Sequence, residues 1–331
     1  MKLKNLLLIW MFLLSGYAFA QQQKLALSNI NHATLNTLVT PYDNPAFTGL
    51  HGAHNVQISY AASYLFKQGN ESFPMQPKHF ATLLYDVGFG KRKQHGLGLI
   101  LNYDRQDAIS KSEVYVNYTR RIKLADKIFI APGIAVGFNQ IRMDFSKLTF
   151  GDMIDPRYGY LFETKEQWFG PTRSFPDFKV GAAFGCYGLL AGFSANHITQ
   201  PRSGFISTAK MPMVLHTFLQ YNFKLHKHWN VLPALVLESR NDGMAALYVS
   251  PALQATWKSK LIAGFNWKNT SALEIQIGYQ PIPQFRVMAF VALPTKEAVY
   301  EQGRINQLGG SMRYLSVDGP QDPMGLNLKK N

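Results

Sequence analysis

Segments of about ten residues in which apolar and polar side chains alternate recur from His54 to Tyr314. In the first of them, Val56, Ile58 and Tyr60 share one face, and the small and polar side chains between them share the other. A strand that crosses a bilayer needs about 9–11 residues, with one face toward lipid and one toward a lumen. The alternation therefore predicts an all-β protein, a transmembrane antiparallel β-barrel of a bacterial outer membrane.

The alternating segments predict about fourteen strands, an even number, as single-chain bacterial barrels require. We expect these strands at Val56–Tyr64, Lys78–Val87, Leu97–Tyr103, Glu113–Thr119, Ile128–Asn139, Asp177–Cys186, Leu189–Ile198, Met213–Leu225, Trp229–Ser239, Ala245–Trp257, Leu261–Trp267, Ala272–Tyr279, Gln284–Leu293 and Asn306–Tyr314. Long and short connections alternate between them, and the longest is Arg142–Pro176. Because such barrels have short periplasmic turns and long extracellular loops, we expect both termini in the periplasm.

The first twenty residues have the features of a cleavable export signal. Lys2 and Lys4 precede the apolar run Leu6–Leu14, and Ala18-Phe19-Ala20 forms an A-x-A cleavage site. The sequence thus predicts a signal peptide at 1–20, a periplasmic N-terminal segment or plug at 21–53, a barrel at 54–315 and a periplasmic tail at 316–331. No Cys follows the cleavage site, which argues against a lipid anchor.

A secreted β-sandwich or propeller is the soluble alternative, since both have short alternating strands. Only 16% of the residues are charged, against about a quarter in soluble domains. No repeat of blade length is present. The lipid-facing Tyr60 and Tyr103 and the terminal Trp229 and Trp267 are typical of the aromatic girdles of membrane barrels. These features favour the membrane barrel.

The sequence contains no pattern of an enzyme or of a metal site. G-x-S-x-G, H-E-x-x-H and C-x-x-C are all absent, and His197 and His79 have no serine placed beside them. His226 and His228 lack a third ligand, and Cys186 is the only cysteine. We therefore expect no catalytic activity, no cofactor and no metal.

Two groups of side chains are candidates for contacts at the ends of the barrel. The first group lies in expected periplasmic turns, where anionic lipid headgroups are favoured over a docking protein: Lys91, Arg92, Lys93, Lys123 and Lys258. The second lies in the longest loop, which is either an extracellular docking surface or plain loop variation: Phe150, Asp152, Asp155 and Tyr158. Despite the net charge of +14, nucleic-acid binding is not expected of an exported barrel.

Small residues occupy the expected lumen face of two neighbouring segments, at Gly133, Ala135, Gly137, Gly181, Ala183 and Gly185. A barrel of this size has room inside for a plug or a ligand. Residues 21–53, which are polar and contain Pro41 and Pro45, are a candidate plug and equally a candidate periplasmic docking segment.

Several stretches resemble the PorP/SprF family of type IX secretion in Bacteroidetes. Asn44-Pro45-Ala46-Phe47-Thr48-Gly49 is similar to the N-P-A-[YF]-x-G signature that opens these proteins. The resemblance continues at Gly96–Leu99, Leu148–Asp152, Phe175–Gly181 and Gly192–Pro201. Taken alone, N-P-A also occurs in FadL-like channels. From its residues, Asn44-Pro45-Ala46 is better explained as an Asx-type turn before the first strand than as a cargo contact.

The resemblance implies a barrel without catalytic activity that assists export or surface attachment of cargo carrying the type IX C-terminal signal, including gliding adhesins. It also implies a periplasmic peptidoglycan-binding lipoprotein as a partner, besides outer-membrane lipids. A porin-like or FadL-like channel for small or hydrophobic substrates is the alternative. The identity of the cargo and the oligomeric state are left open.

Overall fold

The computed structural model describes residues 40–66, 78–90, 93–148, 151–155, 157, 159–160, 164, 170–205, 209–226, 228–241, 246–268, 272–294 and 304–316. The chain divides into two units, 1–31 and 32–331. The first unit lies outside the described residues, and with it the predicted signal peptide. Most of the predicted C-terminal tail does so as well.

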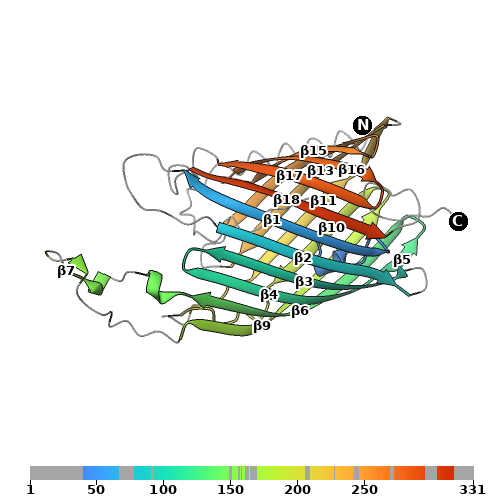
Figure 1. Ribbon diagram of the computed structural model, residues 1–331. Helices are drawn as coiled ribbons and strands as arrows, with labels where there is room; N and C mark the ends of the chain where they lie inside the picture. The colour runs from blue at the N-terminus through green and yellow to red at the C-terminus, as the bar shows by residue number, and fades with distance from the viewer. Residues whose placement is uncertain are drawn as a thin grey trace. The chain divides into compact units, whose positions relative to one another are not determined.

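The second unit is a closed antiparallel β-barrel of fourteen strands (Figure 1), which confirms the predicted fold class. Its strands are β1 (His54–Phe66), β2 (Lys78–Phe89), β3 (His95–Gln106), β4 (Ile109–Arg120), β6 (Ile128–Met143), β9 (Thr172–Cys186), β10 (Leu189–Asn196), β11 (Val214–Tyr221), β13 (Trp229–Arg240), β14 (Ala246–Trp257), β15 (Leu261–Lys268), β16 (Ala272–Ile282), β17 (Phe285–Pro294) and β18 (Arg304–Ser316). Short strands β5 (Ile122–Ala125) and β12 (Phe223–His226) follow β4 and β11 and pair with β6 and β13.

Each strand pairs with its neighbour in sequence, and the first strand closes the ring against the last. The pairing of β1 with β18 runs from His54 opposite Ser316 to Phe66 opposite Arg304. Closure leaves no long open sheet edge, which is the condition for a sheet to cross a membrane.

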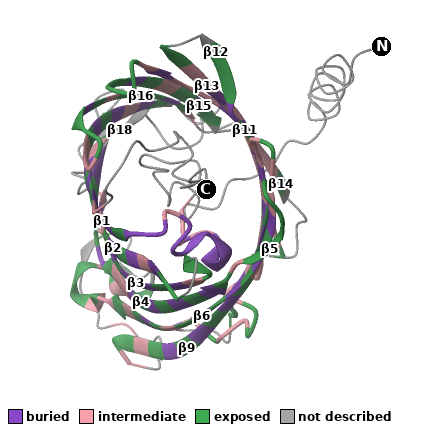
Figure 2. Cartoon of the chain, turned by 90° about the vertical axis from the view of Figure 1, so that its right-hand side faces the viewer, coloured by how far each residue is buried: buried purple, intermediate pink, exposed green. Residues whose placement is uncertain are grey.

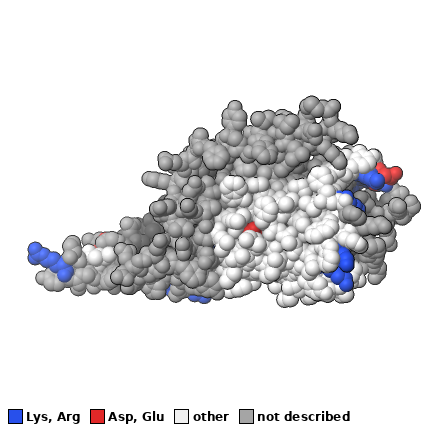
Figure 3. Space-filling view, turned by 90° about the horizontal axis from the view of Figure 1, so that it is seen from above, with Lys and Arg blue, Asp and Glu red and all other residues white. Residues whose placement is uncertain are grey.

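The alternation in the sequence corresponds to the two faces of the wall. In β6, Ile134 and Val136 point outward and are 53% and 49% exposed, whereas Ala131 and Ala135 point into the lumen and are buried. On the face shown in Figure 3, the described surface of the wall is largely uncharged, and its Lys and Arg side chains lie mainly toward the ends. An apolar outer band of this kind is stable in lipid and costly in water.

The two ends of the barrel differ in the length of their connections. The strands β6 and β9 are longer than predicted, so their connection runs from 144 to 171 rather than from 142 to 176. It contains the 3-10 helices η3 (Phe145–Lys147) and η4 (Gly151–Met153) and the small hairpin of β7 (Ile154–Asp155) and β8 (Gly159–Tyr160). We call this the long-loop end and the opposite one the short-turn end. Their assignment to the cell exterior and the periplasm remains a prediction.

Residues 40–53 precede β1 and lie inside the ring of strands (Figure 2), and we call them the lumen segment. The segment contains the 3-10 helix η1 (Pro45–Phe47), whose three residues are all buried. Among the described residues, no helix has the length and apolar character needed to cross a bilayer.

Candidate functional site in the barrel lumen

Asn44 forms the turn of the lumen segment and also ties it to the wall. Its side-chain oxygen accepts a hydrogen bond from the Ala46 backbone N–H at 2.9 Å and so caps η1, with Pro45 at the first helical position. Its Nδ2 donates to the carbonyl oxygens of Ala182 at 3.3 Å and Phe193 at 3.1 Å. One amide thus connects the segment with the adjacent strands β9 and β10.

An apolar cluster lies directly after the turn. Ala46, Phe47 and Leu50 are buried together with lumen-facing residues of several strands, including Phe129 and Phe218. The rings of Phe47 and Phe218 meet edge to face, with centroids 5.6 Å apart. Burying a phenylalanine side chain contributes about 1.5–3 kcal/mol, so Phe47 is a substantial anchor.

Glycines in the wall allow the segment to approach the strands closely. A Cβ atom on Gly133 would lie 2.5 Å from the Ala46 nitrogen, and one on Gly192 would lie 2.6 Å from the Phe47 ring. Gly96 and Gly181 face Thr48 and Asn44 in the same way. Gly133 and Gly181 of the small-residue stripe predicted from the sequence thus face the segment, whereas Gly137 and Gly185 face the wall side chains Tyr115 and Phe129.

Side chains of the wall bind the backbone carbonyl groups of the segment one after another. The contacts are Asn117 Nδ2 to Pro41 O at 2.8 Å, Lys179 Nζ to Tyr42 O at 3.0 Å, Ser194 Oγ to Asp43 O at 2.7 Å, Thr119 Oγ1 to Pro45 O at 2.5 Å and Arg121 Nη2 to Gly49 O at 3.1 Å. The Gly49 N–H in turn donates to Asp86 Oδ2 at 2.7 Å. Irregular backbone at membrane depth needs such partners, and the wall supplies them.

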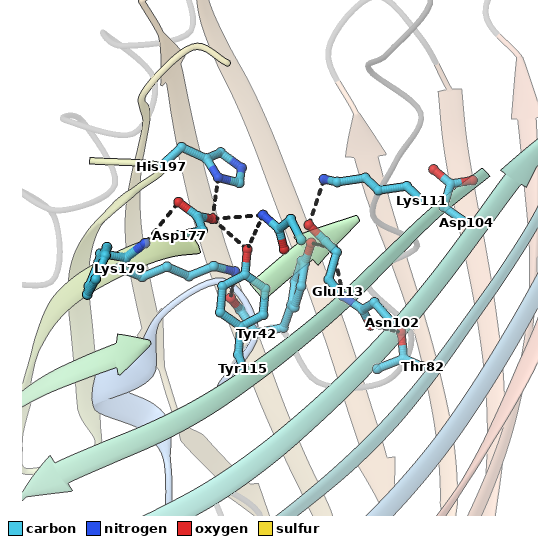
Figure 4. Close-up of polar contacts among 12 residues, drawn as sticks. Tyr42, Thr82, Asn102, Asp104, Lys111, Glu113, Tyr115, Asp177, Lys179 and His197 are labelled. Carbon is cyan, nitrogen blue, oxygen red and sulfur yellow. Dashed lines mark hydrogen bonds and ion pairs between the residues drawn. The ribbon is translucent and has the colours of Figure 1, made fainter. Parts of the chain in front are cut away.

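A buried polar network surrounds Tyr42 at the start of the segment (Figure 4). The Tyr42 hydroxyl donates to Glu113 at 2.7 Å, and Lys111 Nζ lies 2.6 Å from the same carboxylate. Lys179 Nζ is 3.9 Å from the ring centroids of both Tyr42 and Tyr115. A cation between two aromatic faces is stabilised by both of them.

Asp177 is the second acceptor of this network. Its Oδ2 accepts from the Tyr115 hydroxyl at 2.6 Å and from Asn139 Nδ2 at 3.2 Å, and His197 Nδ1 lies 2.6 Å away. Lysine and carboxylate groups of β4 and β9 and the imidazole of His197, which follows β10, are thus held by direct contacts. Buried charges need such partners, since an unpaired one is strongly destabilising.

Tyr42 and His197, which lie outside the spanning strands, have shifted pKa values. Burial raises the pKa of Tyr42 well above its ordinary range, and the nearby Glu113 charge acts in the same direction, so the hydroxyl remains a donor. Burial lowers the pKa of His197 and outweighs the Asp177 carboxylate, which acts the other way. At neutral pH, His197 is therefore an uncharged imidazole that donates from Nδ1 to Asp177.

The histidine and serine side chains of the site are bonded to structural partners, which suits them to holding the lumen segment. The imidazole of His197 contacts Asp177, and the Ser194 hydroxyl donates to the Asp43 carbonyl oxygen of the segment. His79 pairs with the Tyr60 hydroxyl at 2.7 Å. In the described part of the chain, no three His, Cys, Asp or Glu side chains are grouped so that they could hold a metal ion.

The structure brings together one set of sequence-predicted residues and leaves the others apart. Asn44, Pro45, Ala46, Phe47 and Gly49 all lie in the lumen site. Asp152 is exposed in the long loop and accepts from the Thr164 hydroxyl at 3.0 Å. Asp155 belongs to β7, while Phe150 and Tyr158 lie outside the described residues.

The basic residues of the short-turn end are separate from the lumen site. Lys93 is exposed, Lys123 forms an ion pair with Asp126 at 2.7 Å, and Lys258 Nζ lies 4.5 Å from the Trp257 ring centroid. Lys91 and Arg92 lie outside the described residues. Their predicted contact with lipid headgroups stays a prediction.

Tyr42, Glu113 and Lys111 were not predicted as site residues, and neither were Asp177, Lys179 and His197. A signal was nevertheless present, because Asp177 and Lys179 lie in one stretch that carries the family resemblance and His197 lies in another. Together with Gly96, Gly98 and Gly192, these stretches converge on the lumen segment. Their convergence needed the strand register, which the sequence alone did not provide.

A closed antiparallel barrel with an apolar outer wall and a polar lumen defines an outer-membrane β-barrel protein. The model of the family described as "Type IX secretion system membrane protein PorP/SprF" matches residues 30–304. The chain belongs to the PorP/SprF family, as its motifs predicted. It is therefore a secretion-related barrel of the outer membrane.

Solved structures with a similar fold include proteins described as hydrocarbon channels. A TodX deletion mutant, described as a monoaromatic hydrocarbon channel, has 9% identity and a TM-score of 0.50, over 83% of this chain and 93% of that one. The CymD monoaromatic hydrocarbon channel gives 10% identity and 0.49, over 84% and 92%. A Pseudomonas aeruginosa FadL homologue gives 9% and 0.44, over 82% and 93%. At this identity only the fold is comparable. No curated protein matches the sequence.

Proposed function

We propose that this protein is a non-enzymatic scaffold of type IX secretion. In this proposal the barrel assists export or surface attachment of cargo proteins, including adhesins of gliding motility, by holding partners at its two ends. The partners are cargo with the type IX C-terminal signal and a periplasmic peptidoglycan-binding lipoprotein. The family match supports the secretion context of this proposal.

The observation that carries the scaffold role is the lumen segment. Its carbonyl groups, its apolar side chains and its turn are all bound by the wall. A channel needs a continuous water-filled path, and a segment fixed by so many contacts occupies part of that path. We infer that residues 40–53 act as a plug. The loops at one end of the barrel and the basic turns at the other are then the surfaces that contact the partner proteins.

Conductance and copurification together test this proposal. The purified protein, inserted in planar bilayers, is expected to show no steady ion conductance. A tagged copy, crosslinked in cells and purified, is expected to enrich secretion components and cargo over a tagged unrelated barrel. A large steady conductance without such enrichment would favour the channel for small or hydrophobic substrates.

A further inference from the structure

Two arginines face each other in the lumen near the short-turn end, outside the network around Tyr42. Arg286 of β17 pairs in register with Arg313 of β18. Their neighbours Val287 and Met312 are exposed on the outer wall, so both arginines point inward. Arg313 is only 6% exposed. Like charges directly opposite each other on adjacent strands destabilise a sheet unless something compensates them.

The hydrogen bonds of the pair leave donors unused. Arg286 donates from Nε and Nη2 to Gln280 Oε1, at 3.2 and 3.0 Å. Arg313 donates from Nε to Asn55 Oδ1 at 2.8 Å, while its buried Nη2 has no hydrogen-bond partner. Within the described ranges, neither guanidinium forms an ion pair with a carboxylate.

Asp86, the carboxylate linked to Arg313 through Asn55, is bound to other groups. Asp86 accepts from Asn55 Nδ2 with one oxygen and from the Gly49 N–H with the other. Asn55 therefore stands between Arg313 and the carboxylate, and Asp86 accepts no hydrogen bond from the guanidinium in the described part of the chain. A buried guanidinium donor without an acceptor is costly, which indicates that an acceptor is missing from this place.

We propose that Arg286 and Arg313 form a binding site for a small oxyanion of the phosphate class. The planar guanidinium fork matches the geometry of such an anion, and two forks supply both its charge and its directed hydrogen bonds. Since both side chains face the lumen, the source is a water-soluble anion rather than the headgroup of a bilayer lipid. Hydrogen bonds connect Arg313 through Asn55 and Asp86 to the Gly49 N–H. An anion bound to Arg313 therefore also stabilises the end of the lumen segment.

Phosphate-dependent stability of the purified full-length mature protein tests the site. In detergent, inorganic phosphate is expected to raise the unfolding midpoint saturably, by at least about 2 °C, relative to chloride at equal ionic strength. The increase should vanish in Arg313→Gln and in Arg286→Gln. Arg313→Lys, which keeps the charge and loses the fork, should retain only part of it.

Arg120→Gln is the matched control, because Arg120 is an exposed arginine at the end of β4 and its loss should leave the phosphate effect intact. The proposal is overturned if phosphate does not stabilise the wild type, or if it stabilises the glutamine variants equally. Neither result bears on the secretion role.

Discussion

Asn44 shows how a single side chain places the lumen segment. Its oxygen caps η1, and its NH₂ group donates to carbonyl oxygens of two strands. Aspartate is nearly the same size and also caps helices, but it accepts hydrogen bonds and does not donate them when ionised. The two functions of Asn44 can therefore be separated by substitution.

Asn44→Asp is expected to release the lumen segment without unfolding the barrel. The variant keeps the cap, loses two hydrogen bonds and directs a carboxylate at two carbonyl oxygens, at a cost of about 2–4 kcal/mol. Hydrogen exchange of the amides from Ala46 to Leu50 should become much faster. Asn44→Ser, which keeps the cap and one donor, should lie between it and the wild type. Unchanged protection in Asn44→Asp would contradict the assigned role.

His197 makes the stability of the site dependent on pH. Because the pKa of His197 in the folded protein lies below the ordinary value of about 6.5, the unfolded chain binds the proton first as the pH falls. The folded state thus keeps its full stability above about pH 6.5 and loses stability below it, until the lower folded pKa is reached. Each pH unit in that window costs up to about 1.4 kcal/mol.

Unfolding midpoints of the wild type and His197→Gln measure this dependence. Between pH 7.5 and 5.5 the wild type should lose more stability than the variant, and the difference between the two isolates His197 from the other histidines. An equal loss in both proteins would show that His197 does not titrate in this way.

At the scale of elements, the period-two alternation was enough to predict the strands. All fourteen expected segments are strands, because the apolar face of each must meet lipid and the other must face the lumen. The ends of β6 and β9 were missed, since Arg142 and Arg173 are polar residues in strands that extend past the apolar band. Tertiary pairing extends strands further than their local pattern indicates.

The lumen site was predictable only in part. Asn44-Pro45 predicted the turn, and the glycine stripe predicted room inside the barrel. The contacts of Tyr42 with Glu113 and of Lys179 with Tyr42 join residues 71 and 137 positions apart. No local pattern contains such pairings, which depend on the register of the closed ring.

Gly133→Ala tests the close packing between the lumen segment and β6. The added Cβ meets the backbone of Pro45 and Ala46, which cannot move aside as a flexible side chain could. We expect the barrel to form and the amides of residues 46–50 to exchange at least about tenfold faster. Gly264→Ala in β15 is the control. Its added Cβ would lie 3.1 Å from the Leu253 carbonyl oxygen, and its three nearest atoms all belong to β14 and none to the lumen segment.

Equal protection of the segment in Gly133→Ala and Gly264→Ala would mean that η1 does not depend on contact with β6. The fold of the barrel would be unaffected by this result, but close packing against Gly133 would no longer explain how the lumen segment is held.

At the scale of the whole molecule, the features combine into a closed wall with an occupied lumen. The lumen segment leads directly into β1, and β1 closes the ring by pairing with β18. The segment is therefore anchored at the seam of the barrel as well as by its own contacts. Such a rigid body is suited to presenting loops at one end and turns at the other.

The central claim, a role in type IX secretion, is tested most directly by the surface and secreted proteomes of a strain that lacks this protein. We predict loss of cargo carrying the type IX C-terminal signal, with recovery when the wild-type chain is restored. Loss of all such cargo would define a general secretion component, and loss of one adhesin a dedicated partner. An unchanged surface and secreted proteome would contradict the secretion role.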